Sequence, residues 1–168
     1  MPSRQQLGEV LLGCLDEVAA LLRHAHSVAV EEQNALVAND AEALVRTCKA
    51  QEEVLYRISE ADQRAADAAT QLAELAGMDP ENAEAAAIAE AAGAPYNDLI
   101  GEQMALIPVL ADKVRQANEI NHRLLENGLD IVACCLRTLA NDPGPNAYSQ
   151  KAELSGPQAY VLSLDRRA

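Results

Sequence analysis

The chain has 168 residues, a length that suits one domain or one elongated helical bundle and leaves no room for a second substantial core. Its net charge is −13, which argues against nucleic-acid binding, because such binding needs clusters of Lys and Arg. It contains neither Phe nor Trp, which argues against an aromatic-lined ligand pocket. The sequence shows no apolar stretch long enough to span a membrane and no signal peptide, so we expect a cytoplasmic protein.

The first predicted helix covers residues 3–38, and Ser3 is suited to be its N-cap. Apolar residues recur within it at alternating steps of four and three, the spacing of a helix face that packs on a neighbour: Leu7, Leu11, Cys14, Val18, Leu21, Ala25 and Val28. Three further apolar residues, Val10, Leu15 and Leu22, widen this face. A face of this width predicts more than one neighbouring helix.

The second predicted helix covers residues 41–76, with Asp40 as its N-cap and Gly77 just after its end. Steps of four and three predict the residues that face the core: Leu44, Cys48, Gln51, Leu55, Ile58, Asp62, Ala65, Ala69, Leu72 and Ala76. This face is less apolar than that of the first helix. Gln51 and Asp62 mark positions where we expect looser or hydrated packing.

A short Ala-rich helix is predicted over residues 80–92, between the second and the last long helix. Asp79 is its expected N-cap, Pro80 its first residue, and Gly93 closes it. Ile88 is its one large apolar residue, so we expect this helix to pack lightly on one end of the bundle.

The last predicted helix covers residues 97–140, and Pro108 predicts either a kink or a start just before it. Steps of four and three predict its inward positions: Ile100, Met104, Ile107, Ala111, Val114, Asn118, Asn121, Leu125, Gly128, Val132, Cys135 and Leu139. Asn118 and Asn121 therefore lie where core residues are expected. Because a buried amide must be hydrogen-bonded, the pair predicts either a polar layer that sets the register of the bundle or a site that recognises a partner helix, and both interpretations stay open.

The sequence Asn-Asp-Pro-Gly-Pro-Asn at residues 141–146 ends this helix. Residues 142–168 hold three acidic and three basic side chains, so the whole net charge of −13 lies in residues 1–141. This tail has no sustained period, and residues 159–162 are its one candidate for a strand or a short amphipathic segment. We expect an all-α fold: an elongated antiparallel bundle of three long helices with the short helix between the second and third, followed by a mobile tail.

Two pairs of residues could carry metal or phosphotransfer chemistry, and neither has the partners that this chemistry needs. Glu119 and His122 have the Glu-x-x-His spacing of di-iron helical bundles, but the sequence offers no second such pair, so we interpret them as surface residues. His24 and His26 could suggest a phosphoacceptor histidine, but the Lys and Gly that follow one in phosphotransfer domains are missing. We interpret both as partly exposed structural residues, and we expect no enzyme activity, no cofactor and no metal site.

The four cysteines do not form a disulfide framework. Cys14, Cys48 and Cys135 occupy predicted core positions, while the adjacent Cys134 and Cys135 would point about 100° apart on a helix, which does not suit a redox or metal pair. We interpret the cysteines as small buried hydrophobic residues.

Asn118, Asn121, Leu124 and Leu125 form an Asn-x-x-Asn-x-x-Leu-Leu run in the last helix. The second helix carries a Leu, a Lys, an apolar pair, another apolar residue and an Arg: Leu44, Lys49, Val54-Leu55, Ile58 and Arg64. Two long helices, a variable link, a third long helix, a Pro/Gly break and a tail with a Tyr and then a Gly follow one another in order. Over nearly the whole chain, these features resemble the FlgN family of flagellar type III export chaperones.

The resemblance implies a cytoplasmic, non-enzymatic chaperone for the hook-filament junction proteins FlgK and FlgL. Members of the family bind the C-terminal helical region of these clients, prevent premature assembly and deliver the clients to the type III export gate, whose docking protein is FlhA. Carried over to this chain, the family implies a client-binding face on the last helix: Asn118, Asn121, Leu124, Leu125, Ile131 and Leu139.

Tyr148 matches the tail tyrosine that the family associates with export-gate docking, and the alternative is an incidental loop aromatic. The alternative function for the whole chain is a self-associating structural coiled coil without an export client. The width of the apolar face on the first helix motivates this alternative.

Overall fold

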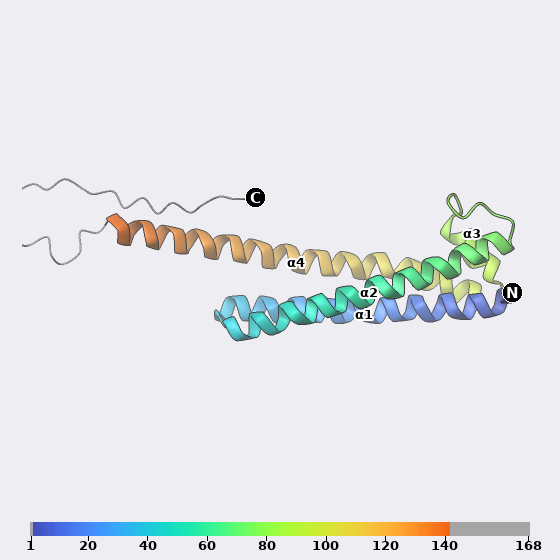
Figure 1. Ribbon diagram of the computed structural model, residues 1–168, viewed down its shortest axis with the longest axis horizontal. Helices are drawn as coiled ribbons and strands as arrows, with labels where there is room; N and C mark the ends of the chain where they lie inside the picture. The colour runs from blue at the N-terminus through green and yellow to red at the C-terminus, as the bar shows by residue number, and fades with distance from the viewer. Residues whose placement is uncertain (1, 142–168) are drawn as a thin grey trace, which may run out of the picture. The chain divides into compact units, whose positions relative to one another are not determined.

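The computed structural model describes residues 2–141, and this part of the chain is helical throughout its length apart from short links (Figure 1). It contains α1 (Arg4–Ala38), α2 (Ala41–Leu75), α3 (Ala85–Ala92) and α4 (Tyr96–Asn141). No strand occurs among these described residues, and the predicted all-α fold is confirmed. The chain divides into two compact units, Met1–Leu129 and Asp130–Ala168.

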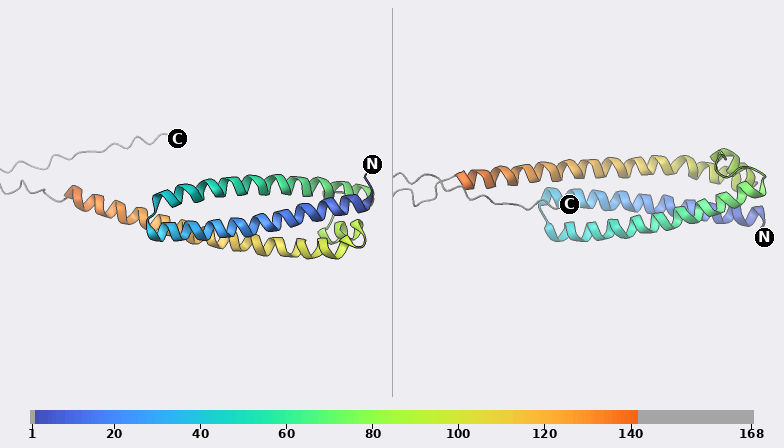
Figure 2. Two further views of the ribbon diagram at one scale, coloured as in Figure 1. Left: turned by 90° about the horizontal axis from the view of Figure 1, so that it is seen from below. Right: turned by 45° about the horizontal axis from the view of Figure 1, so that its top comes forward.

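In the first unit, α1 and α2 form an antiparallel hairpin, and α4 lies along this hairpin in the direction of α1 (Figure 2). Ile100 near the start of α4 belongs to one core cluster with Leu7 and Leu11 near the start of α1. Further along both helices, Asn121 of α4 bonds to Glu32 of α1. The three long helices therefore pack as the predicted antiparallel bundle.

Local capping bonds fix the ends of the α1–α2 hairpin, as the sequence predicts. Ser3 and Gln6 form a reciprocal capping box, in which Ser3 Oγ accepts from the Gln6 N–H at 3.2 Å and Gln6 Oε1 from the Ser3 N–H at 2.9 Å. Asn39 ends α1 in a left-handed conformation, with φ at 54°. The carboxylate of Asp40 then caps α2 by accepting from the N–H of Ala43 at 2.9 Å.

The link after α2 begins as predicted and then departs from the prediction. Gly77 adopts a φ of 72°, and its N–H donates to Glu74 O at 3.0 Å, as expected for a glycine just past a helix end. The helix predicted over residues 80–92 begins only at Ala85. Asp79 caps a turn instead of a helix, because its carboxylate accepts from the Glu81 N–H at 3.2 Å and from the side-chain amide of Asn82 at 2.6 Å.

The short helix α3 packs at the end of the bundle where α1 begins. Its buried residues Ala89 and Ala92 join the first core cluster, and Ile88 packs against that cluster while partly exposed. Gly8 of α1 faces this junction: a Cβ built on Gly8 would lie 3.1 Å from the Cβ of Ala92 and 3.2 Å from Cδ2 of Tyr96. A side chain at position 8 would therefore crowd Ala92 and Tyr96 where α1 meets the start of α4.

The apolar face predicted for α1 is confirmed, because all seven residues of its four-and-three series are buried. Leu15 and Leu22 are buried as well, whereas Val10 is 51 % exposed and the prediction that it widens the core face is wrong. α1 contributes residues to both core clusters, together with residues of α2 and α4. Its wide face is explained by these two long neighbours.

The core face of α2 is lined mainly by alanine, and it differs from the prediction at every second position. Thr47, Val54, Ala61 and Ala68 are buried where Cys48, Leu55, Asp62 and Ala69 were expected: the first three are exposed and Ala69 is half-buried. The positions shared by both series, from Leu44 to Leu72, do face inward. The observed series starts from Leu44 with a step of three, whereas the predicted series starts with a step of four. At every second position, the side chain that meets α1 therefore lies one residue earlier than predicted.

The same one-residue correction applies to α4. Leu110 and Ala117 are buried where Ala111 and Asn118 were expected, and Leu124 is half-buried while Leu125 is 44 % exposed. α4 is continuous through Pro108, so the alternative start just before that proline is wrong.

The predicted tail, including Tyr148 and residues 159–162, lies outside the described residues. Among the described residues, no helix combines the length and the apolar character needed to cross a membrane.

Candidate functional site

Three polar side chains, one from each long helix, meet inside the bundle: Glu32 of α1, Gln51 of α2 and Asn121 of α4. We call them the polar layer. Asn121 and Glu32 are 3 % and 8 % exposed. The side-chain amide of Asn121 donates to Glu32 Oε2 at 2.8 Å and to the backbone oxygen of Ala29 at 2.8 Å. The side-chain amide of Gln51 donates to the same Glu32 Oε2 at 2.7 Å.

The carboxylate of Glu32 is the centre of the polar layer. One of its oxygens accepts two bonds from neutral amide donors, which offsets part of the cost of removing a carboxylate from water. Another acceptor in the layer, Asn121 Oδ1, is buried and accepts no bond from the described protein groups. The bonds of the layer are directional, so any rearrangement that breaks them leaves buried polar atoms without these partners.

The structure separates the two asparagines that the sequence placed together. Asn121 faces the core of the bundle and bonds within the chain, whereas Asn118 is exposed. The prediction that both face inward is wrong for Asn118, because Ala117 takes the buried position. Gln51 lies half-buried in a polar setting, as expected, but Asp62 is exposed and Ala61 replaces it in the core.

Glu32 was not singled out from the sequence, although a signal for it exists. The four-and-three series of α1 continues from Val28 to Glu32 and then to Ala35, and all three are buried. A single carboxylate within an otherwise apolar helix face is therefore the pattern that could have identified Glu32 from the sequence.

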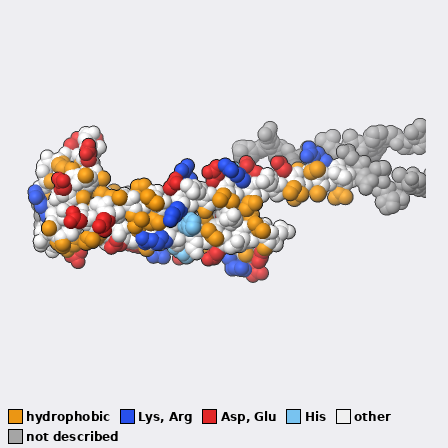
Figure 3. Space-filling model, turned by 180° about the vertical axis from the view of Figure 1, so that it is seen from behind, with side chains coloured by type: hydrophobic (Ala, Val, Ile, Leu, Met, Phe, Trp, Pro, Cys, Tyr) orange, Lys and Arg blue, Asp and Glu red, His pale blue; other side chains and the backbone are white. Residues whose placement is uncertain are grey.

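A second feature of α4 is an apolar row on its surface, which we call the outer stripe. Asn118 begins this row, and exposed large apolar residues continue it at steps of four and three: Leu125, Leu129, Val132, Leu136 and Leu139. At about 100° per residue, these positions lie within roughly 80° of arc on one face of the helix. Each of the five apolar side chains is between 44 % and 70 % exposed. Orange side chains follow the last turns of α4 in Figure 3.

The six residues that the family resemblance implied for client binding fall in different places. Asn118, Leu125 and Leu139 belong to the outer stripe, and Ile131 is 65 % exposed beside it. Leu124 is half-buried, and Asn121 is committed to the polar layer. Three residues of the stripe are missing from that set, although each continues the four-and-three spacing from Leu125: Leu129, Val132 and Leu136.

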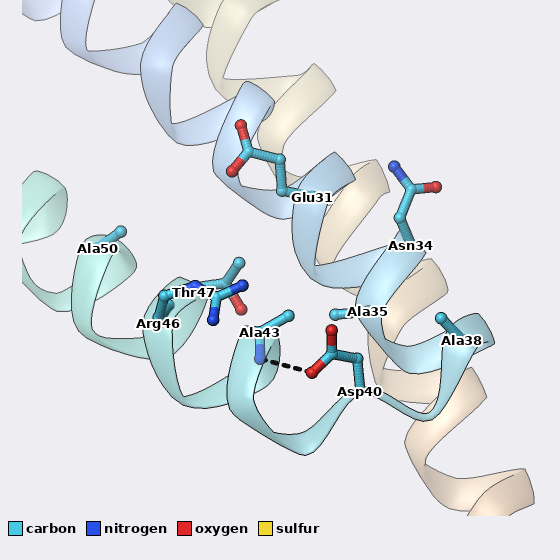
Figure 4. Close-up of a pocket in the computed structure, with 9 residues that line it drawn as sticks. All are labelled: Glu31, Asn34, Ala35, Ala38, Asp40, Ala43, Arg46, Thr47 and Ala50. Carbon is cyan, nitrogen blue, oxygen red and sulfur yellow. Dashed lines mark hydrogen bonds between the residues drawn. The ribbon is translucent and has the colours of Figure 1, made fainter.

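A groove of about 550 Å³ lies between α1 and α2 near the hairpin turn (Figure 4). Alanines form much of its lining, with Glu31, Asn34, Arg46 and Thr47 among the remaining residues. Asp40, also at its wall, is engaged in capping α2. No nucleophile paired with a base lines this groove, so its chemistry gives no reason to assign a reaction to it.

Glu119 and His122, the candidate metal ligands, are both exposed. Glu119 accepts an ion-pair bond from Arg123 at 2.6 Å, and His122 lies 3.2 Å from the carboxylate of Glu126. Within residues 2–141, no group of three or more potential ligands is placed to hold a metal ion. His24 is exposed and His26 half-buried, in agreement with partly exposed structural residues.

Cys14 is buried as predicted, but Cys48, Cys134 and Cys135 are exposed, and the prediction that they are buried is wrong. Cys48 is exposed because Thr47 takes the inward position in α2. Cys134 and Cys135 lie in a part of α4 where the side chains are exposed throughout residues 125–140.

The residues of α2 that resemble a family pattern have mixed roles in the structure. Val54 is buried, Leu55 is 59 % exposed, and Lys49 is exposed. Arg64 bonds to Glu17 of α1 at 2.8 Å, and this hydrogen bond and the charge of Glu17 raise the pKa of the guanidinium. The Arg64 side chain therefore joins α1 to α2 at the surface.

A family model described as FlgN protein matches residues 1–156 of the chain. Neither curated proteins nor solved structures gave a significant match.

Proposed function

The chain belongs to the FlgN family of flagellar export chaperones, and from this we propose that it binds the C-terminal helical region of the hook-filament junction proteins FlgK and FlgL. In this proposal, it works in the cytoplasm without catalysis, prevents its clients from assembling early and delivers them to the type III export gate through FlhA.

The outer stripe is the observation that carries the proposal. Its apolar residues recur at the spacing of a helix that packs on another helix, yet their side chains are exposed in the described structure. A client helix with apolar anchors at steps of three and four could cover this row, which is the usual way in which an amphipathic helix is recognised. Asn118 would supply a polar contact at one end of the stripe. Leu124 and Ile131 lie roughly 60 to 80° outside the arc of the stripe, so they would contact only the flank of a client helix.

Tyr148 is the residue that we propose for docking at the export gate. It lies outside the described residues, so this part of the proposal rests on the family alone.

Calorimetry with the C-terminal region of FlgK, and separately of FlgL, from the same organism tests the proposal. Wild-type protein should bind one or both in the micromolar range or tighter, and Leu136→Asp in the outer stripe should weaken binding at least about tenfold, since a charge would be buried against the client. Val37→Asp is the matched control, because Val37 of α1 is 74 % exposed and outside the stripe. Absence of binding to both clients would exclude the proposed function.

The second candidate function is self-association through the same row, because a four-and-three spacing also suits a coiled coil between two copies. Light scattering over a wide concentration range separates the two functions. A monomer at all concentrations excludes self-association, and a dimer that Leu136→Asp dissociates supports it.

A further inference from the structure

α4 offers two faces that could be turned toward the α1–α2 hairpin. Both share Ile107, Val114 and Asn121. The observed face adds Leu110, Ala117 and Leu124, whereas the face one residue later would add Ala111, Asn118 and Leu125. Because successive residues lie about 100° apart, turning α4 by roughly 50° about its own axis would exchange one face for the other.

Burial distinguishes these two faces at two of the three exchanged positions. Burying Leu110 in place of Ala111 favours the observed orientation, because leucine removes more apolar area from water. At the other end, the choice lies between Leu124 and Leu125, which have the same side chain. Between these two ends, burying Ala117 in place of the Asn118 amide also favours the observed orientation, so hydrophobic contact leaves the orientation undecided only at Leu124 and Leu125.

The polar layer lies in this part of α4, and its bonds depend on direction. Asn121 donates to both Ala29 O and Glu32 Oε2 at 2.8 Å, and Gln51 approaches the same Glu32 oxygen from α2. With a side chain about 6 Å from the helix axis, a turn of roughly 50° would move the Asn121 amide by ~5 Å. Such a displacement would break both bonds and leave buried donors and acceptors without partners.

We propose that Glu32, Gln51 and Asn121 are positioning residues that set the rotational orientation of α4, and so keep Asn118 and Leu125 on the outside of the bundle. In this arrangement the two asparagines of the Asn-x-x-Asn run have separate tasks. Asn121 holds the helix at one angle, and that angle keeps Asn118 and Leu125 exposed. The consequence for a client rests on the proposed function, whereas the orientation of α4 does not.

Thiol reactivity tests the orientation directly on the full chain without any partner. The background carries Cys48→Ser, Cys134→Ser and Cys135→Ser, since these three cysteines are exposed, and retains the buried Cys14. Ala117→Cys and Asn118→Cys are then labelled separately with a maleimide. In the wild-type polar layer, position 117 should react at least about tenfold more slowly than position 118, because a buried thiol reacts only after local opening.

The decisive variant replaces the polar layer with apolar side chains of similar shape: Glu32→Met, Gln51→Met and Asn121→Leu together. The ratio of the labelling rate at position 118 to that at position 117 should fall at least about threefold, since the second orientation becomes accessible while Leu110 still favours the observed one. Glu32→Gln should keep the wild-type ratio, because its side-chain oxygen can accept both amide bonds at the place of Glu32 Oε2.

The matched control is an adjacent pair on α2, Ala65→Cys and Ala66→Cys, of which Ala65 is buried and Ala66 exposed. Their ratio should not change in the apolar variant. An unchanged ratio of labelling rates at positions 117 and 118 overturns the proposal. An equal fall in the ratio at both pairs also overturns it, because this result would mean that the layer holds the bundle together without orienting α4.

If the apolar variant loses its helical circular dichroism signal, the labelling rates at positions 117 and 118 are measured in the single variant Asn121→Leu instead. A ratio equal to that of the wild-type polar layer would again overturn the proposal. Calorimetry with FlgK and FlgL is a separate result. If neither client binds the wild-type protein, the proposed function fails while the labelling ratios still decide the role of the polar layer.

Discussion

Replacing Gly8 by alanine would add one methyl group where α1 meets both α3 and α4. The new Cβ would lie 3.1 Å from the Cβ of Ala92, and 3.2 and 3.3 Å from Cδ2 and Cβ of Tyr96. Favourable carbon contacts begin near 3.5 Å, so these neighbours would have to move by a few tenths of an ångström. Forcing an extra methyl group into a packed site costs roughly 1 to 3 kcal/mol, while replacing glycine within a helix gains about 0.5 to 1 kcal/mol. We expect a net loss of up to about 2.5 kcal/mol in the free energy of unfolding.

Gly13 on the same helix is the matched control. It is exposed, and a Cβ built on it meets nothing within 4 Å. Gly13→Ala should therefore gain the helix preference alone, about 0.5 to 1 kcal/mol. Urea unfolding followed by far-ultraviolet circular dichroism measures both variants, with equal slopes showing that the unfolded reference is unchanged. A Gly8→Ala variant as stable as Gly13→Ala would refute the argument, because it would show that α3 and Tyr96 yield without cost.

Three further predictions can be checked by the same unfolding measurement, and a fourth by circular dichroism alone. Asn121→Leu alone should cost about 1 to 3 kcal/mol, because it removes a donor from the buried Glu32, whereas the variant with all three members of the polar layer made apolar should cost less. Val54→Ala should cost about 1 to 3 kcal/mol and Leu55→Ala within about 0.5 kcal/mol, since only Val54 is buried; the reverse order would contradict the observed core face of α2. Asp40→Ala should cost about 0.5 to 2 kcal/mol through loss of the α2 cap, with the exposed Asp62→Ala as its neutral control. Deleting residues 142–168 should leave the helical signal of the remaining chain nearly unchanged, because residues within 2–141 already form two core clusters among themselves, and a collapse of that signal would show that the tail is needed for folding.

Features that depend on a few neighbouring residues were predictable from the sequence. Ser3, Asp40 and Gly77 cap their helices as expected, because a cap uses bonds within three or four residues. The core face of α1 was also predictable, since its leucines leave no comparable alternative face. Asp79 is the exception: the same residue type that caps a helix also caps a turn, and nothing local distinguishes the two.

The rotational orientation of α2 and α4 was not predictable, because both helices carry two overlapping series of similar hydrophobicity. Val54 and Leu55 are adjacent, as are Leu124 and Leu125, and either member of each pair could face the core. The choice is made by contacts with α1, more than 90 residues away in the case of Asn121 and Ala29. For the candidate site, the sequence led to α4 and to Asn121, but the bonds to Glu32 and Gln51 exist only once three helices come together.

The alanines along the core face of α2 have a thermal consequence. Ala61, Ala65, Ala68 and Ala73 are 6 % exposed or less, and each buries a methyl group where leucine would bury a whole side chain. Heat capacity rises on unfolding in proportion to the apolar area that becomes hydrated, and alanine has no side-chain rotamers to release. The heat-capacity increment of this chain should therefore fall below the usual ~12 to 15 cal/mol/K per residue. The free energy of unfolding would then vary little with temperature. We therefore expect a bundle of modest stability that loses little of that stability on cooling.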